Sequence, residues 1–347
     1  AASNTINVNH NIIENCEFTA TPTSAAFFGI NTNSSAQNVN INNNIVRNIN
    51  LAASTSTMYG INWNGTTPNT SVSDNLIHNF TRSGAGTTYG LFSASSPVNE
   101  LINNNTIRDF TNTNASTTVS ATRGIYVLTA AGNKEIKNNT VYNLATASTS
   151  TSTSSVIDGI RVNYGTTIDM SGNVVYNLSG NAVWVNGIAF GGTTNPSTNN
   201  VYRNKIYTLS STNAAAVVNG MRVEGRTLTI YNNLIGDLKA DNSSGANMVM
   251  GINITSTAAT SDVNVYFNTI YLNASSTGTN FGSSGVFHTT STTATTAKLN
   301  LRNNIIVNNS TPSGTGLTVA YRRSSTTLTN FGDASNNLFY AGAPSAS

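Results

Sequence analysis

The chain has 347 residues, of which only 8% are charged, and its formal net charge at pH 7 is +3. This charge excludes the basic stripe that nucleic-acid binding requires, since the only adjacent basic residues are Arg322 and Arg323. No run of 18 apolar residues occurs, so no membrane span is expected, and the single cysteine, Cys16, excludes an internal disulfide.

An asparagine placed shortly before an aliphatic or aromatic residue recurs along the whole chain, with spacings from 29 to 36 residues. These anchors are Asn11, Asn44, Asn75, Asn105, Asn139, Asn173, Asn204, Asn233, Asn268, Asn304 and Asn337. A glycine followed by an apolar residue lies between each pair of anchors, at Gly29, Gly60, Gly90, Gly124, Gly159, Gly187, Gly220, Gly251, Gly285 and Gly316. The strict alternation of two markers predicts a repeat protein of about eleven units of about 32 residues.

Each unit shows the same order of elements, of which residues 228–254 are an example. Residues 228–231 alternate between apolar and polar, which predicts a short strand, and Asn232 and Asn233 predict a turn. A second brief strand follows, with Asp237 as a further turn residue, and a Ser/Thr/Ala-rich loop leads to the third strand at 251–254. No segment has a period of 3.6 long enough for a helix, which excludes helical solenoids and alternating helix–strand folds.

Three short strands per unit predict an all-β fold, a right-handed parallel β-helix in which residues 1–347 form a single domain of about eleven rungs. A β-propeller is the alternative, but its blades need four strands and about 40 residues. One interior column is expected to hold Val46, Ile77, Ile107, Val141, Val175, Ile206, Ile235, Ile270 and Ile306. A second is expected to hold Cys16, Ile49, Phe80, Phe110, Leu144, Leu178, Leu209 and Leu238, with Cys16 as a buried core thiol.

The two markers have separate expected roles. The asparagines are expected to adopt the left-handed conformation at a sharp corner. Their side-chain amides are expected to form a structural ladder from rung to rung, through Asn44, Asn75, Asn105, Asn139, Asn173, Asn204, Asn233, Asn268 and Asn304. The glycines are expected where the backbone has a positive φ or where there is no room for Cβ.

The repeated pattern, apolar residues alternating up to Asn-Asn-x-Ile-x-Asn, resembles the parallel β-helix repeat of the pectin-lyase-like superfamily. In particular, it resembles Asn/Thr/Ser-rich secreted surface proteins of bacteria. The resemblance implies a secreted or cell-surface location, but it is weakly specific for function, because that fold hosts lyases, hydrolases, adhesins and passive stalks. The family's hydrolases carry an Asn-Thr-Asp segment, an Asp-Asp pair, a Gly-His-Gly and an Arg-Ile-Lys, and this sequence contains none of the four.

Acidic residues are scattered at one or two per rung, and His10, His78 and His288 lie in different rungs, so no metal site and no cofactor are expected. The best local candidate for a binding site is on the segment 220–226. Arg222 and Glu224 are two residues apart and face outward on one strand. Arg161 occupies the same column two rungs earlier.

Tyr126 lies one rung before Arg161, so the four residues Tyr126, Arg161, Arg222 and Glu224 form a patch that can hold a sugar or a carboxylate. The alternative is a surface ion pair with no ligand. Arg123 and Asp158 precede the glycine in neighbouring rungs, which predicts a cross-rung salt bridge.

A second outward column contains tyrosines together with Arg47, His78 and Arg108. Stacked tyrosines on a sheet face can bind sugar rings, or they can simply stabilise neighbouring strands. The candidates for ligand binding in this column are Tyr142, Tyr176 and Tyr207, and Tyr271 also belongs to it.

A β-helix needs covers for its unpaired end strands, and no amphipathic capping helix is apparent at either end of this sequence. Two explanations remain open, neighbouring domains in a longer chain or copies of the chain that stack end to end. The function expected is a non-catalytic stalk, adhesin or filament component outside the cell. The alternative is a carbohydrate-binding or polysaccharide-degrading β-helix, with surface glycans as partners.

Overall fold

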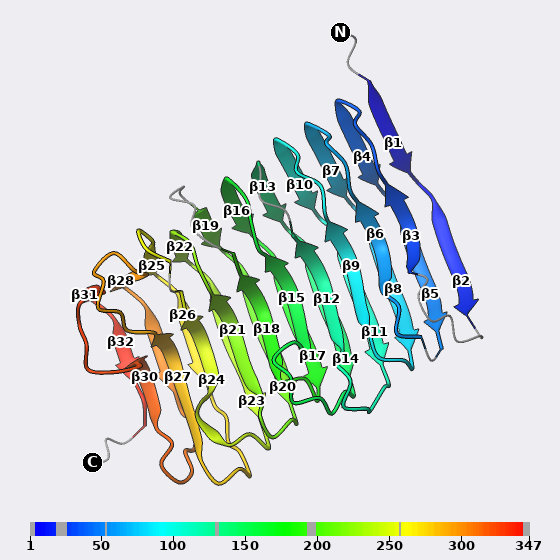
Figure 1. Cartoon of the computed structure of the whole chain (residues 1–347). Helices are drawn as coiled ribbons and strands as arrows, with labels where there is room; N and C mark the ends of the chain where they lie inside the picture. The colour runs from blue at the N-terminus through cyan, green and yellow to red at the C-terminus, as the bar shows by residue number, and fades with distance from the viewer. Residues whose placement is uncertain are drawn as a thin grey trace.

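The computed structural model describes residues 4–18, 26–52, 54–128, 132–192, 199–256 and 258–342. The described residues form strands and turns but no helix, so none of them supplies a helix able to cross a membrane. The strands stack in three parallel sheets, of which sheets A and B have eleven strands each and sheet C has ten (Figure 1). The predicted parallel β-helix with three strands per rung is therefore confirmed.

Successive strands of the chain pass from sheet A to sheet B to sheet C and then begin the next rung. Sheet A consists of β1 (Thr5–Asn9), β4 (Asn38–Asn42), β7 (Asn69–Ser73), β10 (Asn99–Asn103), β13 (Asn133–Lys137), β16 (Thr167–Ser171), β19 (Asn199–Tyr202), β22 (Leu228–Tyr231), β25 (Asp262–Tyr266), β28 (Lys298–Arg302) and β31 (Phe331–Ser335). Sheet B consists of β2 (Ile12–Phe18), β5 (Ile45–Leu51), β8 (Leu76–Arg82), β11 (Thr106–Asn112), β14 (Thr140–Thr146), β17 (Val174–Gly180), β20 (Lys205–Ser211), β23 (Leu234–Ala240), β26 (Thr269–Leu272), β29 (Ile305–Asn308) and β32 (Leu338–Tyr340). Sheet C consists of β3 (Phe27–Thr32), β6 (Met58–Trp63), β9 (Thr87–Ser93), β12 (Ala121–Val127), β15 (Val156–Val162), β18 (Trp184–Phe190), β21 (Val217–Val223), β24 (Gly245–Ile254), β27 (Phe281–His288) and β30 (Thr318–Arg323).

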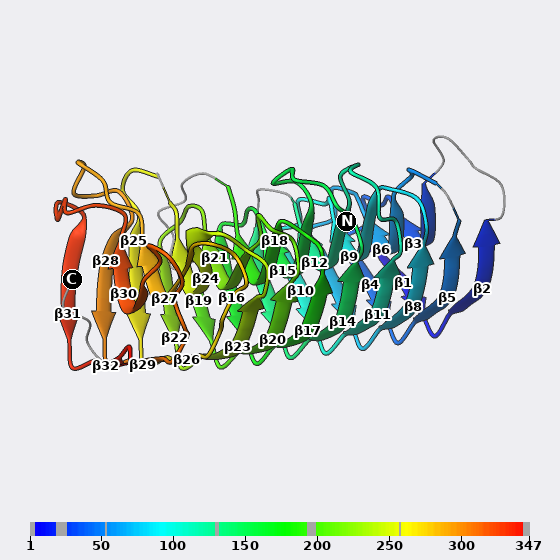
Figure 2. The ribbon, with the colours of Figure 1, turned by 90° about the horizontal axis from the view of Figure 1, so that it is seen from below.

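The core is a set of aliphatic columns that run the length of the solenoid. The strands of sheet B, which contribute to it, stack one beside the next along the axis (Figure 2). Ile107 pairs with Ile77 in the rung before and with Val141 in the rung after, and all three are fully buried. Both predicted interior columns have this register. Cys16 is an exception to the predicted burial, because it is only half-buried. It lies in β2, which has a paired strand on one side only.

The asparagine anchors form a continuous hydrogen-bonded ladder at the corner between sheets A and B. The backbone N–H and the Nδ2 of Asn75 both donate to Oδ1 of Asn105, at 3.0 and 2.9 Å. Asn105 in turn donates to Oδ1 of Asn139 through the same two groups, at 3.0 and 2.9 Å. The second Nδ2 hydrogen of Asn105 is donated to the carbonyl of Val72, at 2.8 Å. The ladder therefore satisfies backbone groups that the sharp corner would otherwise leave without partners.

The left-handed residue at this corner is the one before the anchor, which corrects the expected role of the anchors. Asn43 and Asn104 have φ values of 57° and 56°, and even Phe267 adopts 56° at the equivalent place. The second turn residue also has a positive φ, 58° at Asp109, but it lies within a strand of sheet B and bends that strand. The chain thus uses one left-handed residue for the corner and another for the bend.

The glycine column has no room for side chains, which decides between its two expected roles. At Gly159, a Cβ would lie 2.3 Å from Cγ1 of Val175 and 2.6 Å from the carbonyl oxygen of Gly187. Gly29 to Gly285 share this environment. Gly316 was expected to be the tenth member but precedes β30, and Ala320 takes its place beside Gly285.

Gly159→Ala is expected to lower the free energy of unfolding by about 1–3 kcal/mol, since the new methyl group overpacks the core and presses on a backbone oxygen. Chemical denaturation measures the effect. Gly236→Ala is the matched control, because its Cβ would approach no atom closer than 3.3 Å. Equal stability of the two variants would show that the column is not sterically required.

Two buried arginines seal loops where the chain turns between sheets. Arg82 in β8 occupies the position that Leu51 holds in β5 of the preceding rung, and it is almost fully buried. Its guanidinium donates to the backbone carbonyls of Gly84, Thr87, Ser54, Ser56 and Ala85, at distances from 2.7 to 3.1 Å. Burial lowers the pKa of Arg82 to about 10. Arg226 similarly donates to the carbonyls of Gly191, Gly165 and Asn163.

Candidate functional site

The outer face of sheet C carries a strip of aromatic rings, here called the aromatic strip and defined by Phe28, Tyr59, Tyr89, Phe92 and Tyr126. Phe28 stacks on Tyr59 with ring centroids 4.7 Å apart, and Tyr59 stacks on Tyr89 at 5.2 Å. Tyr89 stacks on Tyr126 at 5.6 Å, and Phe92 packs against the three tyrosines. The residue directly before each glycine of the column faces outward, and so does the second residue after it. The rings at these two positions, such as Tyr89 and Phe92 beside Gly90, therefore merge into one strip.

The predicted salt bridge between Arg123 and Asp158 is confirmed and lies next to the aromatic strip. Nε of Arg123 is 2.8 Å from Oδ2 of Asp158, whose side chain is fully buried. Burial favours the neutral acid, but the charges of Arg123 and Arg161 and a hydrogen bond from Asn186 outweigh it and lower the pKa of Asp158. The guanidinium of Arg123 also stacks over Tyr126 at 4.9 Å. This pair anchors the strip and is not available to a ligand.

Arg161, Arg222 and Glu224 form a compact ion cluster, here called the arginine cluster. Oε2 of Glu224 lies 3.0 Å from Nη2 of Arg161, and Oε1 of Glu224 lies 2.7 Å from Nη2 of Arg222. Arg161 and Glu224 come from rungs that are two apart, and they meet because Ala189 and Gly191 between them are small. A Cβ on Gly191 would lie 2.8 Å from Arg161 and 3.1 Å from Glu224.

The arginine cluster and the aromatic strip are continuous. Oδ1 of Asn163 accepts a hydrogen bond from Nε of Arg161 at 2.9 Å, and its Nδ2 donates to the hydroxyl of Tyr126 at 2.7 Å. At the other end of the cluster, the guanidinium of Arg222 lies 3.9 Å from the ring centroid of Trp184. Burial lowers the pKa of Arg222, while the charge of Glu224 raises it. The four residues Tyr126, Arg161, Arg222 and Glu224 named from the sequence are thus brought together.

This surface can stack sugar rings on its aromatic faces and pair a carboxylate or sulfate with its guanidinium groups. It has two arginines for one glutamate, so it carries an excess positive charge next to the rings. Each carboxylate oxygen of Glu224 is engaged by a guanidinium group, which leaves neither oxygen placed to act on a substrate as a general acid. Within the described ranges, no three His, Cys, Asp or Glu side chains group together to hold a metal ion.

Tyr142, Tyr176 and Tyr207 lie on a different face, the outside of sheet B. Their rings stack at 4.7 and 5.1 Å with interplanar angles of 6° and 7°. The tyrosine ladder is interrupted at the next rung, where Gly236 pairs with Tyr207 on one side and with Tyr271 on the other. The candidate ligand-binding residues therefore divide between two faces and do not form one site.

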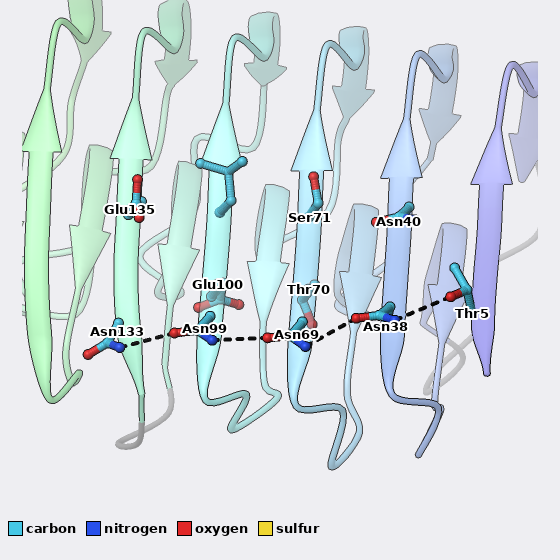
Figure 3. A pocket seen from close by; sticks show the side chains of 11 residues that line it. Thr5, Asn38, Asn40, Asn69, Thr70, Ser71, Asn99, Glu100, Asn133 and Glu135 are labelled. Atoms are coloured by element: carbon cyan, nitrogen blue, oxygen red, sulfur yellow. Dashed lines mark hydrogen bonds between the residues drawn. The ribbon is translucent and has the colours of Figure 1, made fainter. Parts of the chain in front are cut away.

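The outside of sheet A carries a shallow hollow among amide side chains (Figure 3). Asn38 donates to Thr5 at 3.3 Å, and Asn69, Asn99 and Asn133 each donate to the preceding asparagine at 3.0 to 3.1 Å. This second asparagine ladder uses its amides for contacts between rungs. It stabilises the face, and Glu135, which also lines the hollow, is paired with Lys137.

His288 is a fully buried titratable group close to the last rungs. Its Nδ1 accepts a hydrogen bond from Nη1 of Arg323 at 2.9 Å, because a guanidinium can only donate, and its Nε2 donates to the carbonyl of Ala297 at 2.8 Å. Burial lowers the pKa of His288 to about 4, against the effect of the Ala297 hydrogen bond and with the help of the charge on Arg323.

The free energy of unfolding is expected to decrease by about 3 kcal/mol through His288 as the pH falls from about 6.5 to about 4. The unfolded chain takes up this proton near pH 6.5, whereas the folded chain takes it up only near the lowered pKa, so acid favours unfolding in this window. Denaturation curves of the wild type and His288→Gln across this range measure the difference. Identical pH dependence in the two proteins would contradict the assignment.

No family model, no curated protein and no solved structure matches this chain. Trp184, Asn163 and most of the aromatic strip were not predicted from the sequence. A signal for the strip was present, because Phe28, Tyr59 and Tyr89 each come directly before a glycine of the column. Trp184 carried no such signal, since its contact with Arg222 depends on the register between two rungs.

Proposed function

We propose that this protein is a non-catalytic extracellular β-helix of the pectin-lyase-like type, secreted or held at a cell surface, that serves as a stalk, adhesin or filament component. The observation that carries the proposal is the unbroken asparagine ladder, which connects every rung from Asn11 to Asn337. A scaffold reinforced identically in each rung is what a rod under load requires.

The hydrogen bonds between rungs run along the axis of the solenoid, so an axial load is shared by three sheets and the ladder. The charged groups of the outer faces contribute to the same purpose. Asp158 holds the guanidinium group of Arg123 from the neighbouring rung, and Glu224 holds that of Arg161 from two rungs away. Glu14 pairs with Arg47 across β2 and β5. These carboxylates strengthen contacts between rungs and do not converge on a common reaction centre.

The partners we propose are other copies of the chain, or neighbouring domains, that contact the rung ends. Two observations favour this. Phe18 in β2 and Phe339 in β32 lie in register with the buried core residues Leu51 and Ile306 but are 37% and 44% exposed, and both strands have a paired neighbour on one side only. Strand edges with exposed apolar side chains favour pairing with another strand.

Single-molecule pulling tests the structural proposal. Extension is expected in steps of about 11–12 nm or multiples of it, the contour length of one rung of about 33 residues. A rod that extends smoothly at low force, without rung-sized steps, would be unsuited to bearing load.

A catalytic role is tested in parallel by incubation with acidic polysaccharides. Shortening of the polymer that Glu224→Gln abolishes would overturn the non-catalytic assignment.

A second candidate function is carbohydrate binding, favoured by the continuity of the aromatic strip with the arginine cluster. Arg222→Gln is expected to weaken binding of an acidic polysaccharide at least tenfold, the loss of about one charge-assisted contact. Arg108→Gln, on the outer face of sheet B, is the matched control. Calorimetric titration that detects no binding by the wild type, or equal binding by both variants, would exclude this surface as the site.

A further inference from the structure

An ionised pair lies inside the solenoid, where the other columns are mainly aliphatic. Glu100 in β10 and Lys134 in β13 occupy the same position in neighbouring rungs of sheet A. Nζ of Lys134 is 2.7 Å from Oε2 of Glu100, and both side chains are 0% exposed. The same column contains Thr70 in the rung before and Ile168 in the rung after. The ion pair is therefore enclosed on both sides along the axis.

The carboxyl group of Glu100 is polarised from one side only. Nε1 of Trp63 and Oγ of Ser93 both donate to Oε1, at 2.6 and 2.5 Å. Oε2 faces Lys134 and has no other hydrogen-bond partner among the described residues, and neither does Nζ of Lys134. An ammonium group has three N–H donors, so at least two of them lack a described acceptor. Such unsatisfied donors are costly in a dry interior.

We propose that Lys134 and Glu100 join as an intramolecular amide, an isopeptide bond between successive rungs. One proton passes from the ammonium of Lys134 to Oε2, which gives a neutral amine and a neutral acid. The amine nitrogen attacks the carboxyl carbon, a second proton passes from nitrogen to Oε2, and the C–Oε2 bond breaks. One N–C bond forms, one water molecule leaves, and no oxidant or reductant takes part.

The surroundings of the pair favour this condensation. The two donors on Oε1 lie where negative charge develops in the tetrahedral intermediate, the arrangement that stabilises acyl transfer. The sheet register holds the amine against the acid before reaction. Exclusion of water protects the product from hydrolysis. In the amide, Oε1 keeps both of its donors, and nitrogen retains one N–H in place of three.

The bond would convert a rung-to-rung contact into a covalent one. It closes a loop between positions 100 and 134, which is 34 residues (134 − 100). A cross-link of this kind limits the unfolded chain and resists separation of the two rungs under load. It is independent of whether the aromatic strip or any other surface binds a ligand.

Intact-mass spectrometry of the full chain under denaturing conditions tests the proposal. The expected mass is lower than the sequence mass by one water molecule, and trypsin is expected not to cleave after Lys134 but to release the peptides of Glu100 and Lys134 as one joined species. Lys134→Arg is the matched variant, because it retains the positive charge but a guanidinium is a poor nucleophile. It is expected to have the full sequence mass.

Ser93→Ala tests the positioning role of the hydroxyl group. It removes one donor from Oε1 and is expected to slow the appearance of the dehydrated species after synthesis, without preventing folding as followed by circular dichroism. The wild type alone decides the main question. A wild-type chain with the full sequence mass, cleaved normally after Lys134, would show that the pair is a buried salt bridge and would overturn the proposal.

Discussion

Arg82→Met is expected to lower the free energy of unfolding by about 3–5 kcal/mol, because it removes a buried cation and leaves its carbonyl partners without donors. Methionine fills a similar volume, so the change isolates the hydrogen bonds from the packing. Urea or guanidinium denaturation measures the loss. The loop residues between β8 and β9 are expected to become more accessible to hydrogen exchange.

Arg108→Met is the control for this experiment. Arg108 pairs with Asp109 on the outer face of sheet B and remains partly exposed, so its removal is expected to change stability by less than about 1 kcal/mol. If both arginine variants lose the same amount of stability, the loop carbonyls around Arg82 do not depend on its guanidinium group.

Asn105→Ala is expected to cost about 3–5 kcal/mol as well, since three buried groups each lose a hydrogen bond at once. These groups are the N–H and Nδ2 of Asn75 and the carbonyl of Val72, and Oδ1 of Asn139 keeps one donor of two. The backbone at the corner is expected to loosen. Chemical denaturation measures the loss in the free energy of unfolding. Hydrogen exchange at the backbone amide of Asn75 shows whether the loosening occurs at this corner.

Asn99→Ala provides the comparison for the ladder. Asn99 donates to Asn69 in the exposed ladder of sheet A, where water can replace the lost contact, and a change below about 1 kcal/mol is expected. A loss at Asn99 as large as the loss at Asn105 would mean that stacking of amides matters and burial does not.

The sequence was sufficient for the fold because two residue types are required by geometry in every rung. A glycine such as Gly159 is needed because no Cβ fits, and an anchor such as Asn105 is needed because its amide serves three buried partners. The prediction that the anchors themselves adopt the left-handed corner conformation was wrong. That conformation belongs to the residue before each anchor, and Phe267 has the same φ there as Asn104, 56°. Propensity favoured asparagine, but tertiary contacts decide which residue turns.

The interior polar groups could not be predicted in the same way. Nothing in the sequence singled out Glu100 or Lys134 as interior residues, because alternation alone places charged residues outside. The register of the rungs places both in the column of Val39 and Ile168. Arg82 likewise takes the place of Leu51. A column is apolar on average, and exceptions to it are found only when each rung is aligned with its neighbours.

The candidate surface was predicted in part, for a definite reason. The two-residue spacing of Arg222 and Glu224 places them on one face, and the repeat places Arg161 in the same column. The long loops between rungs differ in length, so contacts that cross them, such as Arg222 with Trp184, had no constant offset in the sequence. Contacts within a column follow the repeat, whereas diagonal contacts depend on each side chain.

Because the asparagine ladder has the same direction in every rung, whole rungs can be added to or removed from the solenoid with the ladder still intact. Within the ladder, each anchor donates to the anchor of the following rung and accepts from the anchor of the preceding rung, so every rung offers the same upper and lower surface to its neighbours. Removing the 34 residues from Asn105 to the residue before Asn139 would bring Asn75 against Asn139 with the donors and acceptors still matched. A rod built this way can change its length in steps of about 4.8 Å while its end surfaces remain the same.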